Sequence, residues 1–468
     1  MGSVEKWSPK VLIIPIEAQG HWAPVLPLLH QLVLKKIGFT VLTTAERCDE
    51  LRSYGANGAY EGVEVEFLEV FTDPSTKGLG PLIVPAMMKD FESYRGSGGF
   101  DRSKYTCMIA DMFLYFCQDL ADEWGIPTYC LITSPSYFAL VMLHGDKLVS
   151  GGWTPFDVEK RDKFIELPGL ENFKGVDVPQ AVVHLQPNAF EKFPSATRRA
   201  AGLLINSFQE FDGKSADNLR HQLQSNPFPG KGVPKVYLIG PLLLLPGLSG
   251  SSEVKKRVEE NESIFWLDKQ EMSSVLFICF GSVRALDNRM VSAVAKALED
   301  TGVPFIWALR LPPDQVSKDN LLPRGFEERT QGRGLVLTSW VPQKEILLHP
   351  SVGGFLSHCG YNSVMESMLG GVPIAGFPIY AEQGMNARHM VNELKAAVEI
   401  KGRIREFEAE EIAVSITKLM KGKEGKEART NMHNLRKSAY AAVAERGSSL
   451  QNLQAFLAEI LEPSASCS

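Results

Sequence analysis

Residues 340–383 read WVPQKEILLHPSVGGFLSHCGYNSVMESMLGGVPIAGFPIYAEQ, and this stretch decides the fold of the second half of the chain. The apolar run 352–356 predicts a short buried strand. A tight polar turn follows at 360–363, and we expect a helix from there through Met368 that ends at the glycine pair 370–371. The first N–H groups of a helix have no partner inside the helix. Strand, turn and helix start therefore predict a site for an anion such as a phosphate.

Polar side chains near this turn could donate to the same anion, but each also has a simpler explanation. His358, Asn362 and Ser363 stand where the strand meets the helix. Taken alone, His358 could be a hydrogen-bonded core residue, and Trp340 could equally belong to the core. Ser363 and Glu366 have the spacing of a capping box, which would stabilise the helix without any ligand. Single fragments of this kind do not separate the two explanations.

The whole stretch favours the ligand-binding explanation over the structural one. Its 44 positions resemble, without a gap, the signature box of the plant-type UDP-dependent glycosyltransferases of small molecules. The resemblance implies that Trp340 stacks on uracil and that the backbone of Val341 reads the edge of the base. It implies that Gln343 and Glu366 hold the ribose hydroxyls.

The same resemblance assigns the diphosphate and the sugar. His358, Asn362 and Ser363 match the diphosphate contacts, and Glu382 and Gln383 match the residues that hold the sugar hydroxyls. A glutamine in this last place is typical of glucose donors in the family. The donor-binding set is completed by Gly360 and Tyr361.

This chain departs from the family pattern at two positions. Tyr361 stands where a tryptophan is usual, which puts the sugar selectivity in doubt. Glu382 replaces the commoner aspartate but keeps the carboxylate.

Composition bounds the class of protein. A chain of 468 residues, with 44% hydrophobic and 22% charged residues, predicts a globular protein of two domains. A net charge of −6 argues against a nucleic-acid partner. Seven scattered cysteines without a C-x-x-C pair indicate reduced thiols, and no apolar run reaches the length of a membrane span. We therefore expect a cytoplasmic protein without a membrane span, and a monomer.

The first half predicts a doubly wound parallel sheet. A buried strand over 11–16 is followed by the loop AQGH, a helix and a second strand over 40–44. His21 in that loop could merely cap the helix, and Asp111, at the end of the strand YTCMIAD, could be an N-cap. In the family that the chain resembles, these two positions carry the catalytic histidine and the carboxylate that orients it. Thr133 matches a threonine that contacts the donor sugar.

The second half repeats the pattern. A buried strand over 274–280 ends in Gly281-Ser282, and we expect Ser282 to make a second contact with phosphate. The architecture implied by the resemblance is α/β of the GT-B type, with two Rossmann-like doubly wound parallel-sheet domains facing a cleft. The expected boundaries are 1–241 for an acceptor-binding domain, 242–262 for a linker, 263–447 for a UDP-sugar-binding domain, and 448–468 for a helix that crosses back.

The expected activity is inverting, metal-independent transfer of glucose from UDP-glucose to a hydroxyl of a small apolar acceptor, such as a plant flavonoid, which gives a β-glucoside. No Asp-x-Asp pair is present to hold a metal, and no cofactor is implied, because the UDP-sugar is a co-substrate. An oxidoreductase would need a G-x-G-x-x-G fingerprint after a strand, and none occurs. A non-catalytic sugar-nucleotide binder would not need His21 and Asp111. A different UDP-sugar or formation of a C-glycoside remains open, as does the identity of the acceptor.

Overall fold

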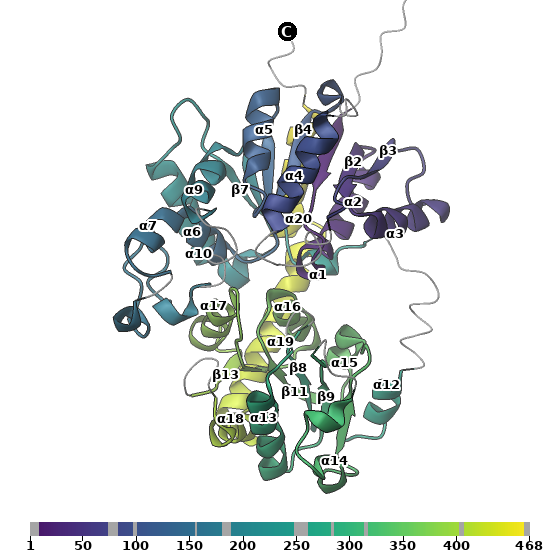
Figure 1. The fold of residues 1–468 in the computed structure, drawn as a ribbon, viewed down its shortest axis with the longest axis vertical. Coiled ribbons are helices and arrows are strands. Elements are labelled where there is room, and N and C mark those ends of the chain that lie inside the picture. The colour runs from purple at the N-terminus through teal and green to yellow at the C-terminus, as the bar shows by residue number, and fades with distance from the viewer. Residues whose placement is uncertain are drawn as a thin grey trace, which may run out of the picture.

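The structure is a computed structural model that describes residues 9–73, 83–96, 101–154, 157–179, 189–247, 261–281, 285–312, 317–401 and 407–462. Two sheets organise it, one in each half of the chain, and Figure 1 shows the halves stacked along the long axis. Every pairing between neighbouring strands is parallel. The expected α/β class with two doubly wound sheets is confirmed.

The first sheet has seven strands in the order β3-β2-β1-β4-β5-β6-β7. The alternating buried strands and amphipathic helices of this half require right-handed crossovers, which place helices on both faces of the sheet. The strands are β1 (Lys10–Ile14), β2 (Gly38–Thr43), β3 (Val65–Glu69), β4 (Cys107–Asp111), β5 (Thr128–Ile132), β6 (Gly202–Ile205) and β7 (Lys235–Leu238).

The second sheet has six strands in the order β10-β9-β8-β11-β12-β13. In both sheets the order reverses once, between β1 and β4 and between β8 and β11. The strands are β8 (Val275–Cys279), β9 (Phe305–Ala308), β10 (Gly334–Leu337), β11 (Val352–Ser357), β12 (Ile374–Gly376) and β13 (Ala397–Glu399).

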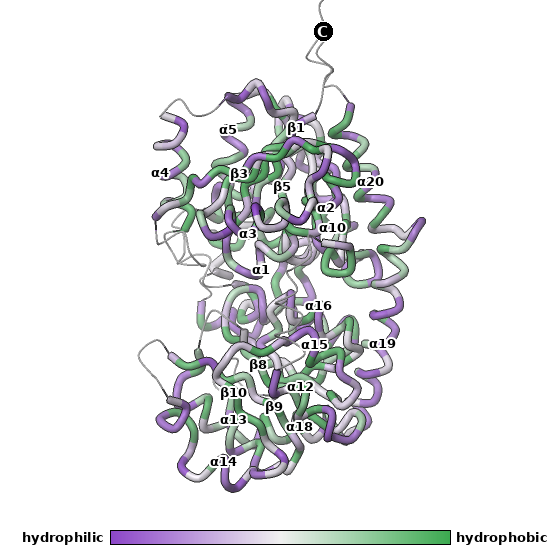
Figure 2. Tube along the Cα trace, turned by 90° about the vertical axis from the view of Figure 1, so that its right-hand side faces the viewer, coloured by the Kyte–Doolittle hydropathy of each residue, from purple (hydrophilic) through white to green (hydrophobic). Residues whose placement is uncertain are grey.

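The helices cover the faces of the sheets and form most of the outer surface. Figure 2 shows apolar segments in the interior of both halves and many hydrophilic positions on outer helices such as α14 and α19. The helices of the first half are α1 (Gln19–Trp22), α2 (Val25–Leu34), α3 (Ala45–Ala56), α4 (Ile83–Gly96), α5 (Phe116–Trp124), α6 (Ser136–Leu143), α7 (Gly145–Ser150), α9 (Ala189–Arg199) and α10 (Gln209–Ser225). Those after them are α12 (Glu262–Leu267), α13 (Asn288–Thr301), α14 (Phe326–Arg329), α15 (Gln343–Leu348), α16 (Tyr361–Gly370), α17 (Gln383–Arg388), α18 (Ala409–Lys421), α19 (Lys423–Val443) and α20 (Ser448–Leu461).

The last helix, α20, packs on the first sheet although it follows the second half in sequence (Figure 1). The ring of Phe456 lies 4.8 Å from that of Tyr129 on β5, and Oε1 of Glu459 accepts from the Tyr129 hydroxyl at 2.8 Å. We propose the domain boundaries given above as the working division of the chain, with α20 as the segment that returns to the first half.

A continuous apolar cluster also joins the two halves. It contains Phe211 of α10 and Tyr361 of α16, whose ring centroids are 5.7 Å apart, together with buried residues of both sheets. Burial of shared apolar surface is the main favourable term in holding such halves together.

Several elements were not predicted, or not in their actual extent. The 14-residue helix α4, between β3 and β4, was not predicted. The polar turn at 360–363 is in fact the first turn of α16, which begins at Tyr361 directly after its N-cap Gly360. After β12 the chain forms α17 and then a π-helical turn at His389–Glu393. Strands β12 and β13 and helix α19 were not predicted at all, because β12 and β13 have only three residues each and give no readable periodicity.

Candidate active site

The predicted site residues stand where the order of the strands reverses. His21 follows β1 and Asp111 ends β4, which are the neighbours at the reversal in the first sheet. Gly281 follows β8 and His358 follows β11 at the reversal in the second sheet. In doubly wound folds the carboxyl ends of strands at such a switch point are where ligands bind.

His21 and Asp111 form a buried pair. Nδ1 of His21 lies 2.7 Å from Oδ2 of Asp111, and the two residues are 8% and 2% exposed. The other carboxylate oxygen, Oδ1, accepts from the backbone N–H of Phe113 at 3.0 Å. The hydroxyl of Thr133, just after β5, lies 3.2 Å from the same His21 nitrogen. Neither residue is a helix cap, because the N-caps of α1 and α5 are Ala18 and Tyr115.

The surroundings of His21 change its basicity. Burial by itself lowers the pKa of His21, but the Asp111 carboxylate, through its charge and its hydrogen bond, and the more distant charge of Glu382 together raise that pKa above its usual value. A carboxylate on Nδ1 also fixes the tautomer, so Nε2 is the nitrogen left with a free lone pair in the neutral ring.

Glycines on two loops leave room around the ring of His358. A Cβ on Gly281 would lie 2.6 Å from Nε2 of His358, and a Cβ on Gly360 would lie 2.5 Å from it, so a side chain at either position would collide with the imidazole. Gly281 also has φ of +84°, which favours glycine. His358 is 7% exposed, and its buried Nδ1 has no hydrogen-bond partner among the described residues. Burial lowers the pKa of His358 to about 4, so the ring is neutral near pH 7.

The start of α16 lies beside this histidine. Its first helical hydrogen bond runs from Val364 N to the Gly360 carbonyl at 3.0 Å, and no side chain caps the helix. The backbone N–H of Tyr361 is directed at the Glu382 carboxylate, so the N–H groups of Asn362 and Ser363 are the part of the first turn that is left to stabilise an anion.

The capping-box explanation for Ser363 and Glu366 is wrong. Ser363 is the third residue of α16 and not its N-cap. Both side chains instead accept from Nε2 of Gln343, Ser363 Oγ at 2.9 Å and Glu366 Oε2 at 2.6 Å. Burial raises the pKa of Glu366, although the hydrogen bond from Gln343 opposes this. The three polar side chains that the signature box implies for ribose and phosphate are thus gathered at one place.

Gln383 has a structural hydrogen-bonding role that the sequence did not reveal. Its Oε1 accepts from the backbone N–H groups of Ile379 at 2.9 Å and Tyr380 at 3.0 Å, and the residue is 3% exposed. Both lone pairs of the oxygen are used, so the amide Nε2 is the group left for a ligand. Beside it, burial raises the pKa of Glu382, while backbone N–H groups, His21 and Asn386 oppose the rise.

Asn386 is a site residue that sequence reasoning missed. It donates to the Glu382 carboxylate and to the Cys359 carbonyl, and it accepts from Tyr137. The only signal in the sequence was its spacing of four residues from Glu382, which places both on one helix face.

Two hydrogen bonds join the start of α16 to the first half. The Tyr361 hydroxyl donates to the Asn206 carbonyl at 2.8 Å, and Asn362 Nδ2 donates to the Gly20 carbonyl at 3.3 Å. The start of α16, where we predict an anion site, is thereby held next to the residue that precedes His21. Because the Tyr361 hydroxyl is engaged with Asn206, it is not directed at a sugar in this arrangement.

The remaining predicted residues lie at the edge of this region or outside the described chain. Trp340 is 46% exposed, which is high for a tryptophan. Val341 is half-buried, and its carbonyl accepts from Gln343 N at 3.0 Å. Ser282 lies outside the described residues.

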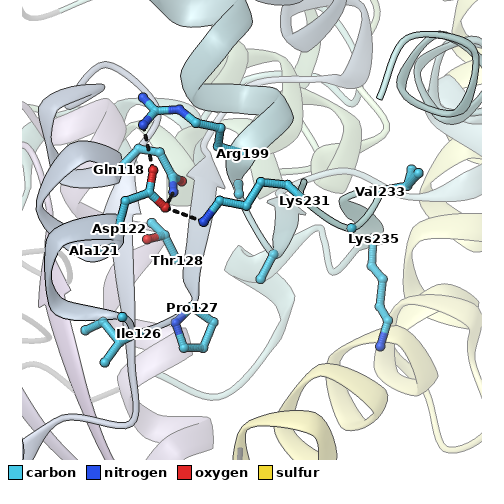
Figure 3. A pocket seen from close by; sticks show the side chains of 14 residues that line it. Gln118, Ala121, Asp122, Ile126, Pro127, Thr128, Arg199, Lys231, Val233 and Lys235 are labelled. Atoms are coloured by element: carbon cyan, nitrogen blue, oxygen red, sulfur yellow. Dashed lines mark hydrogen bonds and ion pairs between the residues drawn. The ribbon is translucent and has the colours of Figure 1, made fainter. Parts of the chain in front are cut away.

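A separate cavity of about 450 Å³ lies at the opposite edge of the first sheet, by the amino ends of β5, β6 and β7 (Figure 3). Its Arg199 and Lys231 side chains are both paired with Asp122, at 2.6 and 2.7 Å. Lys235 at its rim is paired with Glu459 at 2.7 Å. Arg199 also pairs with Asp119 at 2.6 Å, so three carboxylates match the three cations, and the cavity contains none of the predicted site residues.

Within the described ranges, no group of three or more His, Cys, Asp or Glu side chains is arranged to hold a metal ion. In the same part of the chain, no helix has the length and apolar character needed to cross a membrane.

A buried histidine–carboxylate pair beside an uncapped helix start is the arrangement expected of an enzyme that transfers a group from a nucleotide-activated donor. Comparison with known proteins identifies the family. The family model for UDP-glucoronosyl and UDP-glucosyl transferase matches residues 250–439. Baicalein 7-O-glucuronosyltransferase of Scutellaria baicalensis is 35% identical over 76% of this chain and 81% of its own length. Flavonol 3-O-glucosyltransferase UGT71C4 of Arabidopsis thaliana is 33% identical over 83% of this chain and 80% of its own length.

A solved structure agrees with these matches. Phytolacca americana UGT2, complexed with UDP-2fluoro-glucose and pterostilbene, superposes with a TM-score of 0.77 at 30% identity, over 97% of this chain and 100% of that one. The chain therefore belongs to the plant family 1 UDP-glycosyltransferases, and it is a hexosyltransferase that uses a UDP-sugar and a small molecule.

Proposed function

We propose that this enzyme transfers glucose from UDP-glucose to a hydroxyl group of a small apolar acceptor, a plant phenolic of the flavonoid kind, and gives a β-glucoside. The observation that carries the proposal is the pairing of His21 with Asp111 in one half and the anion site at α16 in the other, joined by the bond from Asn362 to Gly20. Relatives whose names specify a flavonol and baicalein support the acceptor class.

In this proposal His21 acts as the general base. Nε2 takes the proton of the acceptor hydroxyl while the oxygen attacks the anomeric carbon of the sugar. Asp111 keeps Nδ1 protonated and stabilises the imidazolium that forms. Attack opposite to the departing diphosphate breaks the anomeric C–O bond and inverts the configuration at that carbon.

The departing UDP would be stabilised by the first-turn N–H groups of α16, by Ser363 and by a neutral His358. Fixed donors aimed at a developing negative charge can replace a metal ion in this role. We therefore propose metal-independent transfer, with Thr133 and Ser282 as further contacts to the donor.

The nucleoside would be held at the N-terminal end of α15 and along α16. We assign Trp340 and the Val341 backbone to the uracil, and Gln343 and Glu366 to the ribose. Glu382 and Gln383 are assigned to the sugar hydroxyls, Glu382 as acceptor and Gln383 through its amide Nε2.

The activity test is a panel of UDP-glucose, UDP-galactose, UDP-xylose and UDP-glucuronate against several phenols, with the product linkage read by NMR and with excess chelator in parallel. We expect UDP-glucose to be preferred, an O-β linkage and no effect of chelator. Preference for another donor would overturn the assignment of glucose, and UDP-glucuronate is the most informative competitor because the relative in Scutellaria is named a glucuronosyltransferase.

The base is tested separately with His21→Ala. General-base assistance is worth roughly 10²- to 10⁴-fold in rate, so we expect a loss of that order with little change in UDP affinity. His221→Ala on α10 is the matched control, because His221 is exposed and far along the chain from the site. Full activity of His21→Ala would contradict the mechanism.

We further propose that the enzyme works as a cytoplasmic monomer, and its described cysteines form no disulfides. Light scattering coupled to size-exclusion chromatography measures the mass in solution, and a dimer would contradict the proposal.

A further inference from the structure

The side-chain amide of Asn386 connects three parts of the molecule whose relative positions matter for sugar transfer. Asn386 is fully buried on α17, four residues after Glu382. Its Nδ2 donates to the carbonyl oxygen of Cys359 at 2.8 Å and to Oε1 of Glu382 at 3.3 Å. Its Oδ1 accepts from the hydroxyl of Tyr137, on α6 in the first half, at 2.7 Å.

The chemistry of the partners fixes the orientation of this amide. A carbonyl and a carboxylate can only accept, so the NH₂ group must face Cys359 and Glu382, and the oxygen must face Tyr137. Both amide hydrogens are then used. A buried polar group with all its hydrogen bonds made is held rigidly, because any displacement leaves a partner unsatisfied.

The three partners belong to different parts of the reaction. Glu382 is the proposed acceptor for the sugar hydroxyls. Cys359 has φ of +62° and stands directly before Gly360, the N-cap of the helix proposed to bind diphosphate. Tyr137 belongs to the half that carries the base, and its ring packs against Phe173 at a centroid distance of 5.2 Å.

We propose that Asn386 is a positioning residue for sugar transfer: it holds the Glu382 carboxylate at a fixed place relative to His21 and to the half that contains Tyr137. The inference rests on the proposed function, because it concerns how the donor sugar meets the base. It does not depend on which UDP-sugar is the donor.

The position of Glu382 has a measurable effect on His21. The groups that face His21 are Asp111 on β4, Thr133 after β5 and, from the second half, Glu382. Burial lowers the pKa of His21, Asp111 raises it most, and Glu382 adds to the rise. The Asn386 hydrogen bond favours the charged form of Glu382, so its loss raises the pKa of Glu382, weakens the negative charge beside His21 and lowers the pKa of His21. A residue with a merely structural role would change stability and leave this pKa unchanged.

The experiment uses the full chain with Asn386→Ala and with Tyr137→Phe, which keeps the aromatic ring and removes only the hydroxyl. The matched control is Ser367→Ala, which removes a buried hydrogen bond from α16 to the Val372 carbonyl (2.7 Å) at the end of that helix away from the site. For each variant, kcat/KM for the preferred UDP-sugar is measured across pH, UDP affinity by calorimetry, and folding by circular dichroism.

We expect Asn386→Ala to lower kcat/KM about tenfold or more, because it removes the hydrogen bond to Glu382. We expect Tyr137→Phe to lower it about fivefold, because it removes only the hydrogen bond that orients the Asn386 amide. The affinity for UDP should stay within about threefold, since neither substitution changes the first-turn N–H groups of α16 that are proposed to bind the diphosphate. The fall of kcat/KM at low pH should move to lower pH in both variants and stay in place in Ser367→Ala.

An unmoved pH profile, or a loss of UDP affinity in parallel with kcat/KM, would overturn the proposal. If Asn386→Ala does not fold, Tyr137→Phe decides, and a wild-type profile from that variant would also overturn it. A failure of the proposed function is distinguishable, because it would appear in the donor panel with the wild-type enzyme before any variant is made.

Discussion

Replacing Asp111 by asparagine should inactivate the enzyme by reversing the tautomer of His21. Oδ1 of Asp111 accepts from Phe113 N at 3.0 Å, while Oδ2 lies 2.7 Å from Nδ1 of His21. An asparagine amide has one oxygen and one NH₂ group. The backbone N–H of Phe113 needs an acceptor, so the oxygen must face it and the NH₂ group must face His21. His21 then has to present a lone pair at Nδ1, which moves its proton to Nε2.

A ring protonated at Nε2 cannot take the proton of the acceptor. The loss should therefore approach the full value of general-base assistance, roughly 10²- to 10⁴-fold in kcat, or about 3–5 kcal/mol in activation free energy. The fold should be retained, because asparagine has nearly the same shape as aspartate and the bond from Phe113 persists.

The assay is the initial rate at saturating UDP-glucose and acceptor, measured across pH, together with UDP affinity and the melting temperature. Because Asp111 raises the pKa of His21, the wild-type rate should fall on the acid side at a pH above the ordinary histidine value of about 6.5. In Asp111→Asn the histidine loses that carboxylate, so any residual activity should persist to lower pH. Asp119→Asn on α5 is the control, since its side chain is 66% exposed and pairs with Arg199. A variant that keeps more than about a tenth of the wild-type kcat would refute the tautomer argument.

Three further predictions test the donor side. Gln383→Glu keeps an acceptor for Ile379 N and Tyr380 N but removes the amide donor. The melting temperature should therefore stay unchanged, while KM for UDP-glucose should rise about tenfold. An unchanged KM would show that Gln383 does not bind the sugar. Glu366→Gln still offers Gln343 an acceptor, so the stability of the fold should change little. The UDP affinity measured by calorimetry should fall about tenfold. An affinity equal to that of the wild type would show that Glu366 has only a structural role. His358 has its pKa lowered to about 4, so it should act as a neutral hydrogen-bonding group, and the ratio of UDP-glucose affinities of wild type and His358→Asn should be constant between about pH 6 and 8. A ratio that grows toward low pH would show that His358 binds the donor as a cation.

Sequence reasoning succeeded where one local signal decided the structure. The apolar run at 352–356 and the glycine pair after Met368 predicted β11 and the end of α16, because buried parallel strands and glycine C-caps depend on neighbouring residues alone. It did not predict the helix that follows β5. Residues 136–143 form α6 there, and every residue of that helix is buried, so its sequence has no polar face from which a helical period can be read.

Several predicted site residues contact one another in the structure, but sequence reasoning did not reveal the hydrogen bonds between them. Pattern matching placed Gln383 and Glu366 in the donor site, yet it gave no hint that one Gln383 oxygen binds two backbone N–H groups or that Gln343 bridges Ser363 and Glu366. Those partners are 3, 4, 20 and 23 residues away. The bond between Tyr137 and Asn386 spans 249 residues and depends on how the two halves pack, which single-sequence patterns do not encode.

The contacts between the halves explain how an enzyme with its base and its donor site on different sheets can keep them aligned. The Tyr361 hydroxyl donates to the Asn206 carbonyl, Nε2 of His389 donates to the Phe211 carbonyl at 2.8 Å, and Arg388 forms an ion pair with the buried Asp177. All three contacts originate within or beside α16 and α17, the helices that carry the proposed phosphate and sugar ligands. A displacement of about 1 Å between reacting groups can cost a hundredfold in rate, so transfer depends on how precisely the two halves are aligned. Because the helices proposed to bind the donor also dock onto the first half, ordering of these helices by a UDP-sugar would also align the sugar with His21.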